Sequence, residues 1–158
     1  MDIDTHLFIG RLLIAAGLSA AIGLEREYHQ KPAGLRTNML IGIGSALFTV
    51  MSLSFVHGAQ GSSDRVAAQI ATGIGFLGAG AILRSEHSIH GLTTAATVWV
   101  NAAIGMAAGA GFHELALATT VVTLVVLAVL PPIEAFFSRW ADRRGINRHT
   151  SHDKERRK

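Results

Sequence analysis

A long stretch that is almost free of basic residues constrains the fold of this chain most. From Thr37 to Ile133 the only basic residues are Arg65 and Arg84. Because a helix needs about 20 mainly apolar residues to cross a bilayer, this stretch has room for four spans. With the apolar segment before it, hydropathy predicts five spans, over residues 7–24, 37–56, 65–83, 92–110 and 114–130. We therefore expect an all-α, polytopic membrane helix bundle.

The basic residues predict the orientation of these spans. Arg26, Lys31 and Arg36 lie between the first two spans, and Arg84 follows the third. Eight of the 14 Lys and Arg residues lie in the last 20 positions. Loops rich in Lys and Arg stay on the cytoplasmic side. The pattern predicts a multi-pass membrane protein with its N-terminus outside and its C-terminus inside.

The pattern changes after Pro131 and Pro132. Apolar residues then recur at helical spacing with basic residues on the other face, which predicts an interfacial amphipathic helix over 133–145. Residues 146–158 are polar and charged, which is typical of a disordered basic cytoplasmic tail. Such a tail can bind anionic lipids or can act only as a topology signal. The transmembrane domain is expected to cover 1–132.

Several classes of function are excluded by composition. Without cysteine, the chain can form no disulfide, thiolate nucleophile or cysteine-based metal site. It contains no Ser-His-Asp order, P-loop or HExxH motif, so we do not expect an enzyme. The basic pI arises from a short tail after a hydrophobic chain, so nucleic acid is not expected as a partner. The first six residues lack Lys and Arg, which favours a retained first helix over a secretory signal.

Glycines are most concentrated in the third predicted span, and the fourth adds two glycines spaced four residues apart. Small residues let membrane helices approach each other closely. We therefore expect the third span to lie at the centre of the bundle. Two alternatives for these small residues are a homodimer interface and a ligand that binds against the helix backbone. The expected packing positions are Gly73, Gly75, Gly78, Gly80, Gly105 and Gly109.

Charged and polar residues gather at the cytoplasmic ends of the first four predicted spans. In an antiparallel bundle these ends meet in one layer, which we call the polar layer. Its residues are Glu25, Arg26, Arg36, Thr37, Arg84, Thr93 and Thr94. The N-termini of the second and fourth spans would offer free N–H groups there. Glu25 is expected to pair with Arg36 or Arg84, in either a binding pocket or a network of salt bridges that holds the bundle together.

Carboxylates are absent from the central parts of the second to fifth spans. Mg²⁺ binding usually uses one or two carboxylates, and proton relays need titratable groups at depth. No cofactor is therefore expected, although Mg²⁺ stays open, with Glu25 as the best candidate ligand.

The order and spacing of five motifs resemble the MgtC/SapB family of membrane proteins over roughly residues 7–111. The motifs are 23–27 (GLERE), 33–37 (AGLRT), 64–70 (DRVAAQI), 73–80 (GIGFLGAG) and 91–96 (GLTTAA). The resemblance implies a bacterial cytoplasmic-membrane protein of four or five helices. Many members of that family carry a C-terminal ACT-like domain. We expect only the membrane domain here, because 18 residues follow Trp140.

The same resemblance implies a role in adaptation to low magnesium. The best-known member resembles a regulator that inhibits the proton-driven ATP synthase. Further motif positions of the family fall on Asp64, Gln69 and Trp99. We expect a non-enzymatic regulator that binds a partner membrane protein or an anionic ligand at the polar layer. The alternatives are a transporter or channel for Mg²⁺ or another cation, and a binder of anionic lipid or phosphate.

Overall fold

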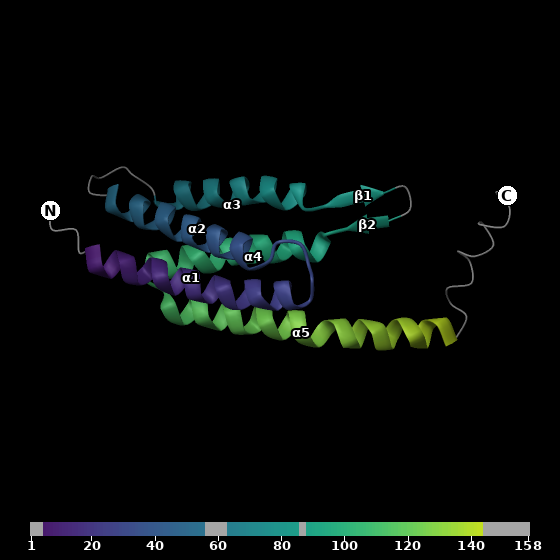
Figure 1. Ribbon diagram of the computed structural model, residues 1–158. Helices are drawn as coiled ribbons and strands as arrows, with labels where there is room; N and C mark the ends of the chain where they lie inside the picture. Colours follow the sequence, from purple (N-terminus) through teal and green to yellow (C-terminus); the bar gives the residue numbers. More distant parts are fainter. Residues whose placement is uncertain (1–4, 56–62, 86–87, 144–158) are drawn as a thin grey trace. The chain divides into compact units, whose positions relative to one another are not determined.

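The computed structural model describes the backbone of residues 5–55, 63–85 and 88–143. This part of the chain forms five helices and one short β-hairpin (Figure 1). The elements are α1 (Thr5–Tyr28), α2 (Leu35–Phe55), α3 (Ser63–Gly80), β1 (Leu83–Ser85), β2 (Ser88–His90), α4 (Leu92–Ala110) and α5 (His113–Arg143). The tail predicted over 146–158 lies outside the described residues.

Four of the five helices are long and apolar enough to cross a membrane. These are α1, α2, α4 and α5. Helix α3 has 18 residues and is about 27 Å long at 1.5 Å per residue, slightly less than the roughly 30 Å hydrocarbon core. The predicted class of fold, an all-α polytopic membrane bundle, is confirmed.

Helix α2 packs against α1 and α4, and these two helices also pack against each other. Helix α3 lies on α4 and α2, on the side of the bundle away from α1 (Figure 1). Ile41 of α2, Ile70 and Ile74 of α3, and Val98 and Ala102 of α4 form a common buried cluster. The prediction that the third span is the central helix is therefore wrong, because α2 and α4 occupy the interior instead.

The connection between α3 and α4 is an antiparallel hairpin that hydropathy does not predict. Arg84 of β1 pairs with Ile89 of β2. Gly91 then turns the chain into α4 with a φ of +90°. A Cβ at this position would lie 2.0 Å from the carbonyl oxygen of Ala81. Glycine is required here both by the left-handed conformation and by the close approach of the backbone.

Helix α5 continues through Pro131 and Pro132 to Arg143. The fifth helix was expected to end at these prolines, and the segment from 133 onward is instead the last part of the same helix. Proline removes a hydrogen bond from a helix interior, but its fixed φ remains helical. The chain divides into two compact units, residues 1–124 and 125–158, and α5 contributes to both.

Candidate polar site at the ends of α1, α2 and α4

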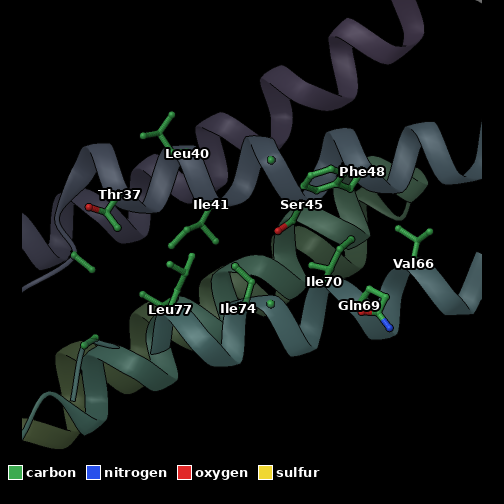
Figure 2. Close-up of a pocket in the computed structure, with 15 residues that line it drawn as sticks. Thr37, Leu40, Ile41, Ser45, Phe48, Val66, Gln69, Ile70, Ile74 and Leu77 are labelled. Carbon is green, nitrogen blue, oxygen red and sulfur yellow. The ribbon is translucent and has the colours of Figure 1, made fainter. Parts of the chain in front are cut away.

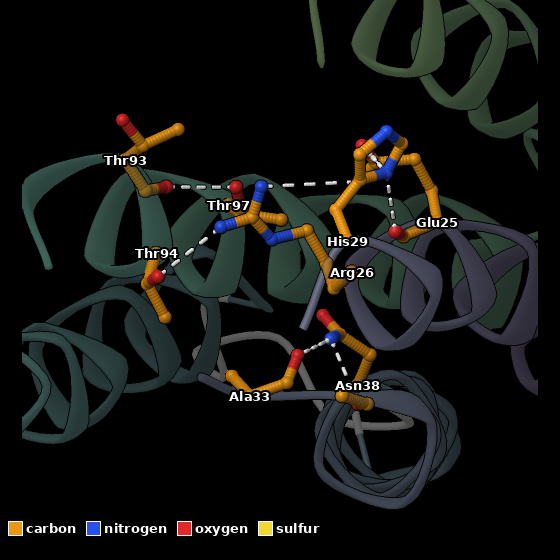
Figure 3. A network of polar contacts seen from close by, with 9 residues as sticks. Glu25, Arg26, His29, Ala33, Asn38, Thr93, Thr94 and Thr97 are labelled. Carbon is orange, nitrogen blue, oxygen red and sulfur yellow. Dashed lines mark hydrogen bonds and ion pairs between the residues drawn. The ribbon is translucent and has the colours of Figure 1, made fainter. Parts of the chain in front are cut away.

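Arg26 lies in the last turn of α1 and is only 4% exposed. Its Nη2 donates a hydrogen bond to Thr94 Oγ1 in the first turn of α4, at 3.2 Å (Figure 3). A buried guanidinium requires partners, because the charge has lost most of its contact with water. The contact therefore ties the end of α1 to the start of α4.

Glu25 is paired with two residues close to it in sequence, Arg26 in α1 and His29 just after the end of α1. Its Oε2 lies 3.8 Å from Nη1 of Arg26, and its Oε1 lies 3.1 Å from Nδ1 of His29. The same His29 nitrogen lies 3.0 Å from the carbonyl oxygen of Glu25. Glu25, Arg26, His29 and Thr94 are called the Arg26 cluster below.

The Arg26 cluster retains unused hydrogen-bonding capacity. Arg26 Nε and Glu25 Oε2 are buried and make no hydrogen bond to any described residue. Arg36 is exposed and forms no ion pair with the described part of the chain. The expected Glu25–Arg36 pair is therefore absent from the described residues. The side chain of Arg84 lies outside the description.

Asn38 and Asn101 form a second polar contact inside the bundle. Both side chains are fully buried. Asn101 Nδ2 donates to the carbonyl oxygen of Asn38 at 2.7 Å. Asn38 Nδ2 donates to the carbonyl oxygens of Ala33 and Gly34 (Figure 3). The Asn101 amide therefore links the middle of α4 to α2, and the Asn38 amide binds the loop that precedes α2.

The start of α2 is already capped by the chain itself. The backbone N–H of Leu35 donates to Oε2 of Glu27 at 2.9 Å. Gly34 permits this approach, because a Cβ there would lie 2.1 Å from the same oxygen. A carboxylate at a helix N-terminus satisfies a free donor and the helix dipole. The prediction of free N–H groups at this end is therefore wrong for Leu35.

Among the remaining predicted polar residues, Thr93 lies beside Thr94 of the Arg26 cluster (Figure 3), and the others lie elsewhere. Thr93 is exposed, and its carbonyl accepts a hydrogen bond from Thr97 Oγ1 at 2.7 Å. Trp99 is 54% exposed. Thr37 and Gln69 line a cavity of about 710 Å³ between α2 and α3 (Figure 2). Asp64 lies in the first turn of α3, and its side chain is outside the description.

Two predicted packing glycines bring α4 against α2. A Cβ at Gly105 would lie 2.4 Å from the carbonyl oxygen of Gly42, and one at Gly109 would lie 2.5 Å from that of Ala46. Gly42 in turn meets α1, since its Cβ would lie 1.8 Å from Ser19 Oγ. The backbones of three helices are therefore in direct contact along this seam.

The glycines of α3 behave differently. Gly78 faces Ala95 of α4, where an added Cβ would meet ordinary contact distances of 3.6 Å and longer. At Gly73, Gly75 and Gly80 no described atom lies within 4 Å of an added Cβ. These three residues leave open space beside α3 instead of a tight helix contact.

Arg11 contacts α4 near its C-terminus, at the end opposite Thr94. Its Nη1 donates to the carbonyl oxygen of Gly109 at 3.0 Å, and its guanidinium lies 5.7 Å from the ring centre of Phe8. A cation near the last carbonyls of a helix is favoured by the helix dipole.

Sequence reasoning did not select Arg11, Asn38 or Asn101 as site residues. The signal that could have found them is a polar side chain within an apolar span, which needs a partner in the bundle.

Candidate metal ligands are few in the described structure. Across residues 5–55, 63–85 and 88–143, no group of three His, Asp or Glu side chains is placed to hold a metal ion. Glu25 and His29 are the pair of potential ligands within the Arg26 cluster. The guanidinium of Arg26 stands beside them, so the cluster combines both signs of charge.

The chain is similar to several curated bacterial proteins. It is 52% identical over 132 residues to the "Putative magnesium transporter YhiD" of Escherichia coli K12, covering 79% of this chain and 61% of that protein. It is 47% identical over 128 residues to protein MgtC of Brucella abortus, covering 81% and 53% of the two chains. A Haemophilus influenzae protein is 42% identical over 154 residues, covering 92% and 63%.

The chain thus spans between about half and two thirds of the length of these relatives. No solved structure matches it. The sequence model that represents the MgtC family matches residues 12–136 of this chain. This range includes every residue of the Arg26 cluster and of the α2–α4 seam. This chain therefore belongs to the MgtC family.

Proposed function

We propose that the chain is a non-enzymatic regulatory membrane protein linked to magnesium homeostasis. Its site of action would be the Arg26 cluster, where it binds a partner membrane protein or an anionic ligand. The link to magnesium rests on relatives, one of which has a name that includes "magnesium transporter". The proposal places the chain in a bacterial cytoplasmic membrane, with the ends of α1 and α4 that carry the cluster facing inside.

The buried charge of Arg26 is the observation that carries this proposal. A divalent cation at the cluster would lie close to a guanidinium that is 4% exposed. Two positive charges close together in a low-dielectric interior repel each other strongly. Glu25 offsets part of the Arg26 charge, with its Oε2 3.8 Å from Nη1, and Arg26 Nε, which has no hydrogen-bond partner among the described residues, is the donor left for an acidic ligand or partner.

The glycine seam supports the same proposal. Gly42, Gly105 and Gly109 bring the backbones of α1, α2 and α4 into contact, and the added-Cβ distances of 1.8–2.5 Å leave no room for a methyl group. A hydrated Mg²⁺ ion keeps several of its waters and needs far more space than this. The interior of these three helices is suited to a fixed scaffold that presents the cluster.

Growth in low magnesium tests this function. In a bacterial strain whose own copy of the gene is deleted, we expect the wild-type chain to restore growth and Arg26→Gln to fail. Arg139→Gln is the matched control, because this arginine is exposed on α5. Immunoblots of the membrane fraction establish that the variants are present at equal levels. Full rescue by Arg26→Gln at the wild-type level would overturn the assignment of the site.

A second candidate function is transport of Mg²⁺, and it is favoured by a carboxylate oxygen of Glu25 that lies 3.8 Å from Arg26 Nη1 but accepts no hydrogen bond from a described residue. Oε2 of Glu25 is buried without a hydrogen-bond partner among the described residues. If Mg²⁺ binds there, millimolar MgCl₂ will raise the Tm of the wild-type chain but not that of Glu25→Ala. The regulatory proposal expects equal Tm changes for the two chains.

A further inference from the structure

The cavity between α2 and α3 is an apolar groove. Its volume is about 710 Å³, and its lining is apolar apart from Thr37, Ser45 and Gln69. Figure 2 shows Thr37 and Leu77 toward one end of the groove, and Phe48 and Val66 toward the other. Because α2 is a membrane-spanning helix by length and composition, the groove runs in the same direction as the spanning helices.

The groove exists because two facing helices present glycine to it. Gly44 of α2 and Gly73 of α3 both line the cavity, and no described atom lies within 4 Å of a Cβ added to either. The rims are open, since Leu40 is 70% and Phe48 is 60% exposed. In a bilayer such exposed apolar residues face lipid chains.

The length of the groove matches one leaflet of a bilayer. Its α2 wall runs from Thr37 to Phe48, which is about 16 Å along a helix axis. Half of the hydrocarbon core is about 15 Å. The groove therefore matches in length an acyl chain that lies in one leaflet.

A basic residue stands at the end of the groove that contains Thr37. Arg36 is exposed, and it precedes the groove residue Leu40 by four positions, so both lie on one face of α2. It forms no ion pair with the described residues. Guanidinium groups bind phosphate oxygens well, because their donors match the geometry of the anion.

We propose that this groove is a lipid site, in which one acyl chain of a bilayer phospholipid lies between α2 and α3 and Arg36 binds the phosphate of its headgroup. The lipid fills the space left by Gly44 and Gly73 and supports α3, which lies at the side of the bundle. The site is separate from the Arg26 cluster and does not depend on its function.

Native mass spectrometry of the full chain tests the proposal. The chain is purified in a mild detergent and titrated with phosphatidylglycerol, and the ratio of lipid-bound to free protein is measured. We expect Gly73→Leu to remove the bound lipid by filling the groove. Gly75→Leu is the matched control, because it adds the same side chain to open space on α3 outside the groove. It should bind lipid like the wild type.

The headgroup contact is tested with Arg36→Gln. A basic residue near an anionic surface contributes enough to change binding about fivefold. We expect Arg36→Gln to lower the preference for phosphatidylglycerol over phosphatidylcholine by about that factor. Equal lipid binding by Gly73→Leu and Gly75→Leu would overturn the proposal. It would also be overturned if Gly73→Leu abolished a dimer mass while leaving bound lipid unchanged, because a second copy would then occupy the groove.

Discussion

Single polar side chains join the helices of this bundle at three depths. Arg26 contacts Thr94 at one end, Asn101 contacts Asn38 below it, and Arg11 contacts α4 near Gly109 at the other end. Each contact crosses between helices, and each uses a donor that would be costly to leave unpaired in an apolar interior. The polar residues therefore determine which helices are neighbours, while the apolar residues supply the bulk of the contact area.

The Asn101 contact should contribute measurably to stability. Asn101→Ala removes the donor to the Asn38 carbonyl. Hydrogen bonds between membrane helices contribute about 0.6 kcal/mol on average and up to about 1.7 kcal/mol. We expect the free energy of unfolding in detergent micelles to fall by about 1 kcal/mol, as measured by denaturant titration followed by circular dichroism.

Thr119→Val is the control for this measurement. Thr119 is intermediate in exposure, and its hydroxyl donates only to the carbonyl of Leu115 in its own helix. Its loss should leave the free energy of unfolding nearly unchanged. Equal effects of the two substitutions would show that the Asn101 bond does not stabilise the bundle.

Some of the polar contacts could be predicted from the sequence and others could not. The order of charges along the chain was enough to place Arg26 and Thr94 at helix ends that meet. Of the two predicted partners of Glu25, Arg36 forms no ion pair with the described residues, and the side chain of Arg84 is not described. The observed partners are Arg26 and His29, which are close to Glu25 in sequence. Spacing along a helix reveals which residues share a face, but not which of several distant arginines the fold brings close.

The seam between α2 and α4 is a close backbone contact between helices. Gly105 and Gly109 are four residues apart on α4, and they meet Gly42 and Ala46, which are also four residues apart on α2. Matched small residues at this spacing let two helices approach until their backbones touch. The seam makes α2 and α4 one rigid unit on which α1 packs.

Gly109→Ala should disrupt this seam. The added methyl group would lie 2.5 Å from the Ala46 carbonyl and 2.8 Å from its Cα, both of which are backbone atoms. Forcing an extra carbon into a packed interior costs about 1–3 kcal/mol. We expect the Tm in detergent to fall clearly. Gly75→Ala, which adds the same group to open space, should not lower it. If Gly109→Ala has a Tm as high as that of Gly75→Ala, the backbones of α2 and α4 are not closely packed at Gly109.

Glycine content alone misplaced α3. Residues 73–80 hold four glycines, but only Gly78 lies near another helix in the described structure. A glycine permits close approach without requiring it, and the position of a helix depends on the faces of its neighbours. The continuation of α5 through Pro131 and Pro132 was missed for a related reason. A proline lowers the stability of a helix locally, but its fixed φ is compatible with a helix, so the helix can continue through it.

The distribution of basic residues predicts how the chain crosses the membrane. Twelve of the 14 Lys and Arg residues fall on one side if all five helices cross. A C-terminal green fluorescent protein fusion should then fluoresce, and a C-terminal alkaline phosphatase fusion should be inactive, because both report a cytoplasmic C-terminus. An active phosphatase fusion would mean an even number of spans, with α3 the first helix to re-examine because it is the shortest.

The central claim is that a closed helix bundle presents a polar binding site and does not conduct Mg²⁺. Purified wild-type chain and Glu25→Gln are reconstituted into liposomes that contain a Mg²⁺-sensitive dye, and Mg²⁺ influx is followed after external MgCl₂ is added. We expect both chains to give the same rate as protein-free liposomes, because Arg26 and the glycine seam oppose a cation path. An influx with the wild type that Glu25→Gln abolishes would contradict the claim.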